Sequence, residues 1–117
     1  MTDLIRPALY GAEHPVALLE PGEPLDATSA GRLDLAGPVC EAGDVLARDL
    51  GRWLSPGELA HCGRGALLAI GRVGAYGAAM SMTYNGRPRA AEVAVEGGVP
   101  RLSRRRETLE DLVARDV

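Results

Sequence analysis

Short runs in which apolar and polar residues alternate cover much of the chain, and this period of two is typical of half-buried β-strands. The pattern predicts strands over residues 13–19, over 32–35 and on toward 39, and over 43–50, 92–95 and 99–103. Residues 66–70 have the sequence Ala-Leu-Leu-Ala-Ile, which is apolar on both faces. This segment is therefore expected to be the most buried strand.

Turn residues separate these runs at short intervals. The chain contains 15 Gly and 8 Pro, which suits many short strands and turns better than a helix bundle. Gly97-Gly98 lies between two predicted strands and indicates a tight hairpin, and Asn85-Gly86 indicates another tight turn. Residues 21–31 are predicted to form a surface loop, and residues 55–58 a turn.

Helical patterns occur near both ends of the chain. Residues 6–10 begin with an Arg-Pro pair, and Pro7 suits the first turn of a short helix. Over residues 106–115, apolar residues form a stripe at helical spacing, and Asp111 and Arg115 are placed for a stabilising i,i+4 ion pair. We therefore predict one mainly β domain over residues 1–117: an antiparallel β-sandwich or barrel with a short C-terminal helix.

The composition narrows the classes of function. With one Trp, three Tyr and no Phe, the core must be built from aliphatic side chains. A net charge of −3 gives no electrostatic reason to expect a nucleic acid or an anionic membrane as partner. The chain begins without the pattern of a signal peptide, and its longest aliphatic run is far too short to span a bilayer. A reducing cytoplasm is the expected setting.

Few side chains could bind a metal. The plausible zinc ligands are His14, His61, Cys40 and Cys62. Their spacing lacks the short paired separations of zinc sites, so we expect no metal site. The two cysteines could pair once but do not amount to a disulfide framework.

Four segments spread over nearly the whole chain form a more specific pattern. They are Arg6-Pro-Ala-Leu-Tyr10-Gly-Ala, Gly37-Pro-Val-Cys40-Glu41-Ala-Gly-Asp44, Gly74-Ala-Tyr76-Gly77 with Tyr84-Asn-Gly-Arg-Pro88, and Arg104-Arg-Arg-Glu-Thr108. In order and spacing these segments resemble the diaminopimelate decarboxylases, which are fold-type III enzymes dependent on pyridoxal phosphate. The resemblance covers the C-terminal β-domain of that family only.

The resemblance implies an enzyme in which a pyridoxal-phosphate-binding (β/α)8 barrel precedes this β-domain, with the active site at a homodimer interface. The implied reaction converts meso-diaminopimelate, a small amino acid, to L-lysine and carbon dioxide in lysine biosynthesis. The barrel would have to be supplied in cis or in trans. All 13 basic residues of the chain are arginine, so the chain has no lysine amine to hold the cofactor covalently. We therefore expect the chain to be inactive alone.

The family also implies roles for five residues. Arg6 and Tyr10 would bind the distal carboxylate of the substrate, and Glu41 would bind its distal ammonium group. Cys40 would act near the reacting carbon as a proton donor, and its segment would reach the cofactor of the other subunit. Tyr76 would contact the cofactor, helped by a run of glycines around it. This set of groups would recognise a substrate with a second amino-acid end.

Some positions depart from the family pattern. Glu13 stands where an aromatic residue is usual, and Met82-Thr83 stands where family members often have Ser-Asn. Arg72 adds a positive charge beside the Tyr76 segment. The substrate could therefore be another amino acid.

A different class of function is a non-catalytic interaction or regulatory module that binds a full-length relative. In either case, a domain normally covered by a barrel and a dimer partner should expose apolar surface when isolated, so we expect marginal stability and self-association.

Overall fold

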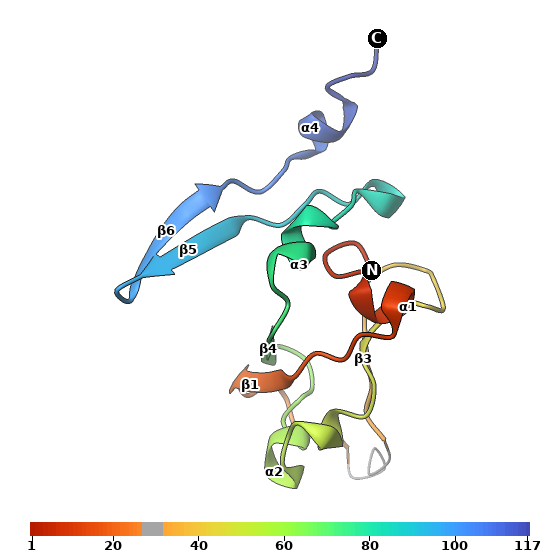
Figure 1. The fold of residues 1–117 in the computed structure, drawn as a ribbon. Coiled ribbons are helices and arrows are strands. Elements are labelled where there is room, and N and C mark those ends of the chain that lie inside the picture. Colours follow the sequence, from red (N-terminus) through yellow and green to blue (C-terminus); the bar gives the residue numbers. More distant parts are fainter. Residues whose placement is uncertain (27–31) are drawn as a thin grey trace.

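In the part of the chain that the structure describes, the fold consists of three separate antiparallel strand pairs and several short helices (Figure 1). The computed structural model describes residues 1–26 and 32–117. The strands are β1 (Val16–Glu20), β2 (Leu35–Ala36), β3 (Val45–Ala47), β4 (Leu67–Ile70), β5 (Glu92–Glu96) and β6 (Val99–Arg104). The helices are α1 (Arg6–Tyr10), α2 (Pro56–Leu59), α3 (Ala75–Ala79) and α4 (Leu109–Val113), with 3-10 turns η2 (Leu50–Arg52) and η3 (Tyr84–Gly86).

The predicted fold class is confirmed in its antiparallel pairing and in its C-terminal helix. In the described part of the chain, however, the strands form two-stranded sheets with the orders β1-β4, β2-β3 and β5-β6 instead of one sandwich or barrel. The pairs β2-β3 and β5-β6 join strands that follow one another in sequence, whereas β1-β4 joins distant segments.

The hydrophobic core of the molecule includes side chains of the β1-β4 ladder. Val16 pairs with Ile70, and the register shifts by a bulge near the far end of β1. Val16 packs with Leu50 and Leu54 in the core, where each is at most 4% exposed. The partly buried side chains packed around them are Leu18, Leu33, Leu35, Ala47, Trp53, Leu59, Cys62 and Leu68.

The prediction that residues 66–70 form the most buried strand is wrong. Leu67 is 49% exposed, and the other residues of β4 are only half-buried. The cause is that β4 belongs to a two-stranded ladder, and among residues 1–26 and 32–117 no second sheet covers its outer face.

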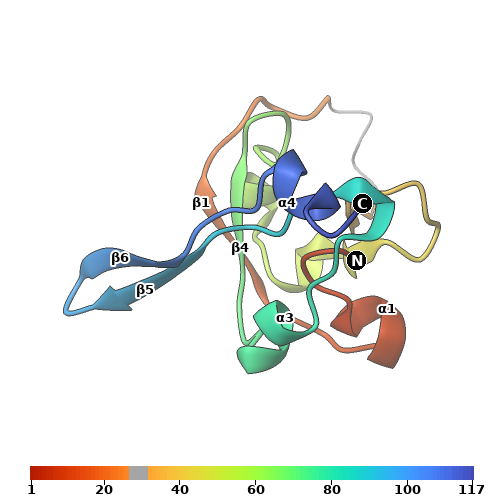
Figure 2. The ribbon, with the colours of Figure 1, turned by 90° about the horizontal axis from the view of Figure 1, so that it is seen from above.

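The β5-β6 hairpin projects from the rest of the molecule in both views (Figures 1 and 2). Its two-residue turn has φ of 56° at Gly97 and 81° at Gly98, which glycine adopts without strain, and this confirms the predicted hairpin. On one face of the ladder Val93 lies opposite Leu102, and these side chains are 55% and 61% exposed. Apolar surface is therefore exposed as expected, and self-association stays a prediction.

The helices agree with the sequence pattern in part. Helix α1 has the predicted bounds and ends at Gly11, whose φ is 64° and whose amide donates to the carbonyls of Arg6 and Pro7. The turn predicted at residues 55–58 is the start of α2, because Ser55 and Glu58 form a capping box. Helix α3 was not predicted.

Helix α4 is shorter than the predicted 106–115, and Thr108 and Asp111 form a capping box at its start. Asp111 also binds Arg105 through both carboxylate oxygens, in place of the expected pair with Arg115. No helix in residues 1–26 or 32–117 is long and apolar enough to cross a membrane.

Candidate functional site

Arg6 lies against two tyrosine rings. Its guanidinium carbon is 5.9 Å from the ring centroid of Tyr10 and 5.5 Å from that of Tyr76. Arg6 and Tyr10 are four residues apart in α1, so the helix itself places them on one face. Tyr76 comes from α3 and meets them only through the tertiary fold. We call Arg6, Tyr10 and Tyr76 the arginine–tyrosine cluster.

The charge of Arg6 has no acidic partner in the part of the chain that the structure describes. The salt bridges there involve Arg32, Arg48, Arg52, Arg89, Arg104, Arg105 and the terminal amine. The Nε atom of Arg6 is buried and lacks a hydrogen-bond partner among the described residues. The phenols of Tyr10 and Tyr76 belong to side chains that are 62% and 61% exposed. The cluster therefore offers a guanidinium and two phenols to an anion, and a carboxylate has the matching geometry.

Two glycines allow α3 to present Tyr76. Gly74 precedes the helix with φ of 64° and ψ of −165°, a conformation that residues with a side chain rarely adopt. Gly77 is buried, and a Cβ there would overlap a methyl group of Val73. The glycines predicted to give flexibility near Tyr76 therefore meet a conformational and a packing requirement.

Cys40 and Glu41 lie at the exposed tip of a tight loop built around Asp44. The carboxylate of Asp44 is buried and accepts hydrogen bonds from the Val39 amide, at 3.0 Å, and from the amino group of Met1. Burial disfavours the ionised form of Asp44, but these hydrogen bonds outweigh it and hold the pKa of Asp44 below its usual value.

The main chain closes the same loop. The amide of Gly37 donates to the Asp44 carbonyl at 2.8 Å, and the Asp44 amide donates to the Glu41 carbonyl at 2.9 Å. These hydrogen bonds fix the loop ends, so the tip is held at a defined place on the surface.

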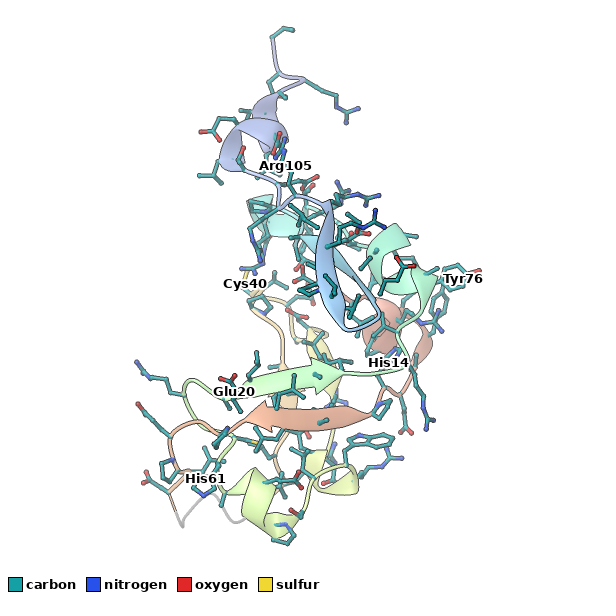
Figure 3. All side chains as sticks on the ribbon, turned by 90° about the vertical axis from the view of Figure 1, so that its left-hand side faces the viewer. His14, Glu20, Cys40, His61, Tyr76 and Arg105 are labelled. Carbon is teal, nitrogen blue, oxygen red and sulfur yellow. The ribbon has the colours of Figure 1, made fainter. Side chains whose placement is uncertain are left out.

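The structure does not bring Cys40 and Glu41 to the arginine–tyrosine cluster. The side-chain amide of Asn85, in η3, donates to the sulfur of Cys40 at 3.5 Å. Figure 3 shows Cys40 and Tyr76 on opposite sides of the molecule. The five residues proposed from the sequence therefore form two groups in one chain.

Sequence analysis missed an ion pair near the start of β1. Arg52 binds Glu13 through both carboxylate oxygens, and its guanidinium lies 5.6 Å from the ring centroid of Trp53. The hydrogen bonds from Arg52 lower the pKa of Glu13. The Glu13 departure from the family pattern is therefore accompanied by a basic partner. No local sequence signal indicates this pair, because Glu13 and Arg52 are 39 residues apart.

These residues line a cavity of about 150 Å³. Its walls are formed by Pro7, Gly11, Ala12, Glu13, His14, Val45, Leu46, Ala47, Arg48, Arg52 and Trp53. None of the five predicted site residues is among these lining residues, although Pro7 and Gly11 are the sequence neighbours of Arg6 and Tyr10.

The four potential zinc ligands are not assembled into a site. Within residues 1–26 and 32–117, no three His, Cys, Asp or Glu side chains are grouped closely enough to bind a metal ion. Cys40 and Cys62 are both free thiols. Burial and the charge of Glu58 raise the pKa of the Cys62 thiol.

Comparison with known proteins identifies a matching family and similar relatives. Residues 1–74 match the family described as pyridoxal-dependent decarboxylase, C-terminal sheet domain. The chain is 44% identical over its whole length to diaminopimelate decarboxylase of Neisseria meningitidis serogroup A, and 46% identical to that of Deinococcus radiodurans. It covers 26% and 28% of those relatives, so it spans about a quarter of their length.

A solved structure of similar fold is a mutant diaminopimelate decarboxylase of Helicobacter pylori complexed with L-lysine. The TM-score is 0.78 at 38% identity, and the match covers 97% of this chain and 25% of that one.

Proposed function

The chain belongs to the pyridoxal-dependent decarboxylases, as their C-terminal sheet domain, and on this premise we propose that it supplies substrate-binding and interface residues to a diaminopimelate decarboxylase. The proposed reaction converts meso-diaminopimelate to L-lysine and carbon dioxide in the cytoplasm. The proposed assembly is a homodimer whose barrel domains come in cis or in trans. The observation that carries this proposal is the Arg6 guanidinium, which contacts two tyrosine rings and has no acidic partner among the described residues.

Arg6 and Tyr10 would bind the distal carboxylate of the substrate. Contact with the rings of Tyr10 and Tyr76 positions the guanidinium, and its N–H groups would donate to a carboxylate. Because Arg6 has no salt bridge within the described residues, a carboxylate does not have to displace an acidic side chain of this chain.

Cys40 and Glu41 would act in the site of a second subunit. Both are exposed, and Cys40 lies on the opposite side from Tyr76, which supports a role across a dimer interface (Figure 3). Glu41 would bind the distal ammonium group of the substrate. Cys40, positioned by the amide of Asn85, would return its Sγ–H proton to the substrate α-carbon once carbon dioxide has left.

Pyridoxal phosphate fits this chain as a contact rather than as a covalent adduct. The chain has no lysine amine for attachment, while the exposed Tyr76 is available as one contact. When bound, the cofactor withdraws electrons from the substrate α-carbon and so permits loss of the carboxylate. The barrel domain is proposed to supply the attachment, and the chain is proposed to be inactive without it.

Reconstitution tests the proposal. The chain is mixed with a barrel domain from a family member and pyridoxal phosphate, and carbon dioxide release from meso-diaminopimelate is measured. We expect release only when both parts are present. Arg6→Ala should lower kcat/KM roughly 10- to 100-fold, because hydrogen bonds to a charged group contribute about 1.5–3 kcal/mol. Glu41→Gln should also lower it, whereas Arg64→Ala, at an exposed position, should not.

The same experiment separates the alternatives. A stable complex without carbon dioxide release would favour a non-catalytic interaction module. Faster release from another amino acid would change the substrate but keep the reaction. Failure to form any complex would contradict the proposal.

A further inference from the structure

His14 is buried at the end of the β1-β4 ladder, next to the two chain segments that lead from the ladder to α1 and to α3. It is 4% exposed, and its Nδ1 lies 3.2 Å from the carbonyl oxygen of Gly71. The amide of Gly71 in turn donates to the carbonyl of Pro15 at 2.8 Å. One side-chain and one main-chain hydrogen bond therefore join residues 14 and 15 to Gly71.

The contact with a carbonyl fixes the tautomer of His14. A carbonyl oxygen only accepts, so Nδ1 must carry the proton. The other ring nitrogen, Nε2, is buried and has no hydrogen-bond partner among the described residues. Burying an unpaired nitrogen is unfavourable compared with an apolar side chain at the same place. The bond to Gly71 is therefore the feature that distinguishes histidine from an ordinary core residue here.

The position of this junction connects it to the cluster. Going back along the chain from His14, a short segment leads to α1 with Arg6 and Tyr10. Going forward from Gly71, another short segment leads to α3 with Tyr76. Figure 3 shows His14 at the end of the β1-β4 ladder that lies on the same side as Tyr76.

The backbone between Gly71 and Tyr76 is conformationally constrained, so the position of Gly71 affects the position of Tyr76. Arg72 has φ of 53° and Gly74 has φ of 64°, so the chain changes direction sharply before α3. Apart from the contact of the Tyr76 ring with Arg6, α1 and α3 make few contacts in the described structure. The relative placement of the two helices therefore depends on the junction at their base.

We propose that His14 is a positioning residue whose Nδ1–H bond to the Gly71 carbonyl places the Tyr76 ring against Arg6. The contact between Arg6 and Tyr10 does not depend on this bond, because both residues belong to one helix. The consequence for substrate binding rests on the proposed function, since the cluster is the proposed carboxylate site. The geometric part of the proposal is independent of catalysis.

The experiment uses the 117-residue chain and NMR of labelled tyrosine and arginine side chains. The chain has three tyrosines, and Tyr84 serves as an internal reference outside the cluster. His14→Gln should abolish cross-peaks between the side chain of Arg6 and the ring of Tyr76 while keeping those between Arg6 and Tyr10. His14→Asn should retain both sets, because the asparagine amide nitrogen occupies nearly the place of Nδ1.

A second variant tests the junction without changing His14. In Gly71→Ala, the new Cβ would lie 3.2 Å from Cγ of Pro15, so Pro15 must yield by a few tenths of an ångström and the junction is strained. The Arg6–Tyr76 cross-peaks should weaken here too. Cross-peaks of unchanged intensity would contradict the proposal even if the glutamine variant failed to fold.

Two other results would overturn the inference. One is retention of the Arg6–Tyr76 cross-peaks in folded His14→Gln, and the other is their equal loss in His14→Asn. In a reconstituted decarboxylase, His14→Gln should raise KM more than it lowers kcat, and asparagine should restore KM. Normal NMR behaviour together with absent activity would reject the proposed function and leave the positioning role intact.

Discussion

Replacing Gly37 with alanine should disrupt the loop that carries Cys40 and Glu41. A Cβ at Gly37 would overlap both carboxylate oxygens of Asp44, a residue that is only 3% exposed and whose carboxylate already accepts a hydrogen bond from the Val39 amide. Gly37 does not have a positive φ, so alanine fits the backbone and the collision is the main effect. The carboxylate must move, and the loop must move with it.

The size of the effect follows from these contacts. Losing a hydrogen bond to a buried charged group costs about 1.5–3 kcal/mol, and forced overpacking costs about 1–3 kcal/mol. We therefore expect Gly37→Ala to lower the free energy of unfolding by roughly 3–5 kcal/mol. A domain whose whole stability is about 5–15 kcal/mol would be strongly affected.

Urea denaturation followed by the fluorescence of Trp53 measures this loss. Trp53 is the single tryptophan of the chain and packs against the core. With an m-value of about 2 kcal/mol/M, the unfolding midpoint should fall by about 1.5–2.5 M. Gly43→Ala is the matched control, because a Cβ at Gly43 meets nothing within 4 Å and its φ is not positive. Equal midpoints for Gly37→Ala and Gly43→Ala would refute the reasoning.

Other perturbations act on the core, on α4 and on the two thiols. Leu50→Ala should cost about 2–5 kcal/mol in thermal or urea unfolding, because Leu50 is 1% exposed in the core cluster. Hydrogen bonds from Arg105 and from the capping amide lower the pKa of Asp111. The helical order that ionised Asp111 gives α4 should therefore be complete above pH 3.8, the ordinary pKa of this carboxyl group, and should be lost as the pH falls through the lower pKa of Asp111 in the folded state. Carbonyl and Cα chemical shifts measure this loss. Cys40 is exposed, whereas burial raises the pKa of Cys62, so a thiol reagent near pH 8 should modify Cys40 first.

Each of these predictions has a simple control. Leu102→Ala, at a residue that is 61% exposed, should change the unfolding free energy by less than about 0.5 kcal/mol. Asp111→Asn should remove the pH dependence of α4, and a titration unchanged by that variant would contradict the role of Asp111. Cys40→Ser should remove the fast phase of thiol modification, and its survival would show that Cys62 is the more reactive group.

The sequence by itself determined the local structure of this protein. Gly97-Gly98 specified a two-residue turn because glycine adopts positive φ at both positions without strain. Pro7 and Gly11 specified the start and end of α1, and the spacing of Arg6 and Tyr10 in that helix put them on one face. Such features depend on a few adjacent residues and on backbone dihedral preferences.

The relative placement of distant segments was decided only by the tertiary structure. The contact of Tyr76 with Arg6 depends on the β1-β4 ladder and on the bond from His14 to Gly71. The separation of Cys40 from this cluster likewise follows from a loop closed around Asp44. These arrangements depend on packing and hydrogen bonds between segments far apart in sequence, and hydrophobic periodicity contains no information about which segments meet. For the same reason, the pattern predicted antiparallel strands but not their division into separate pairs.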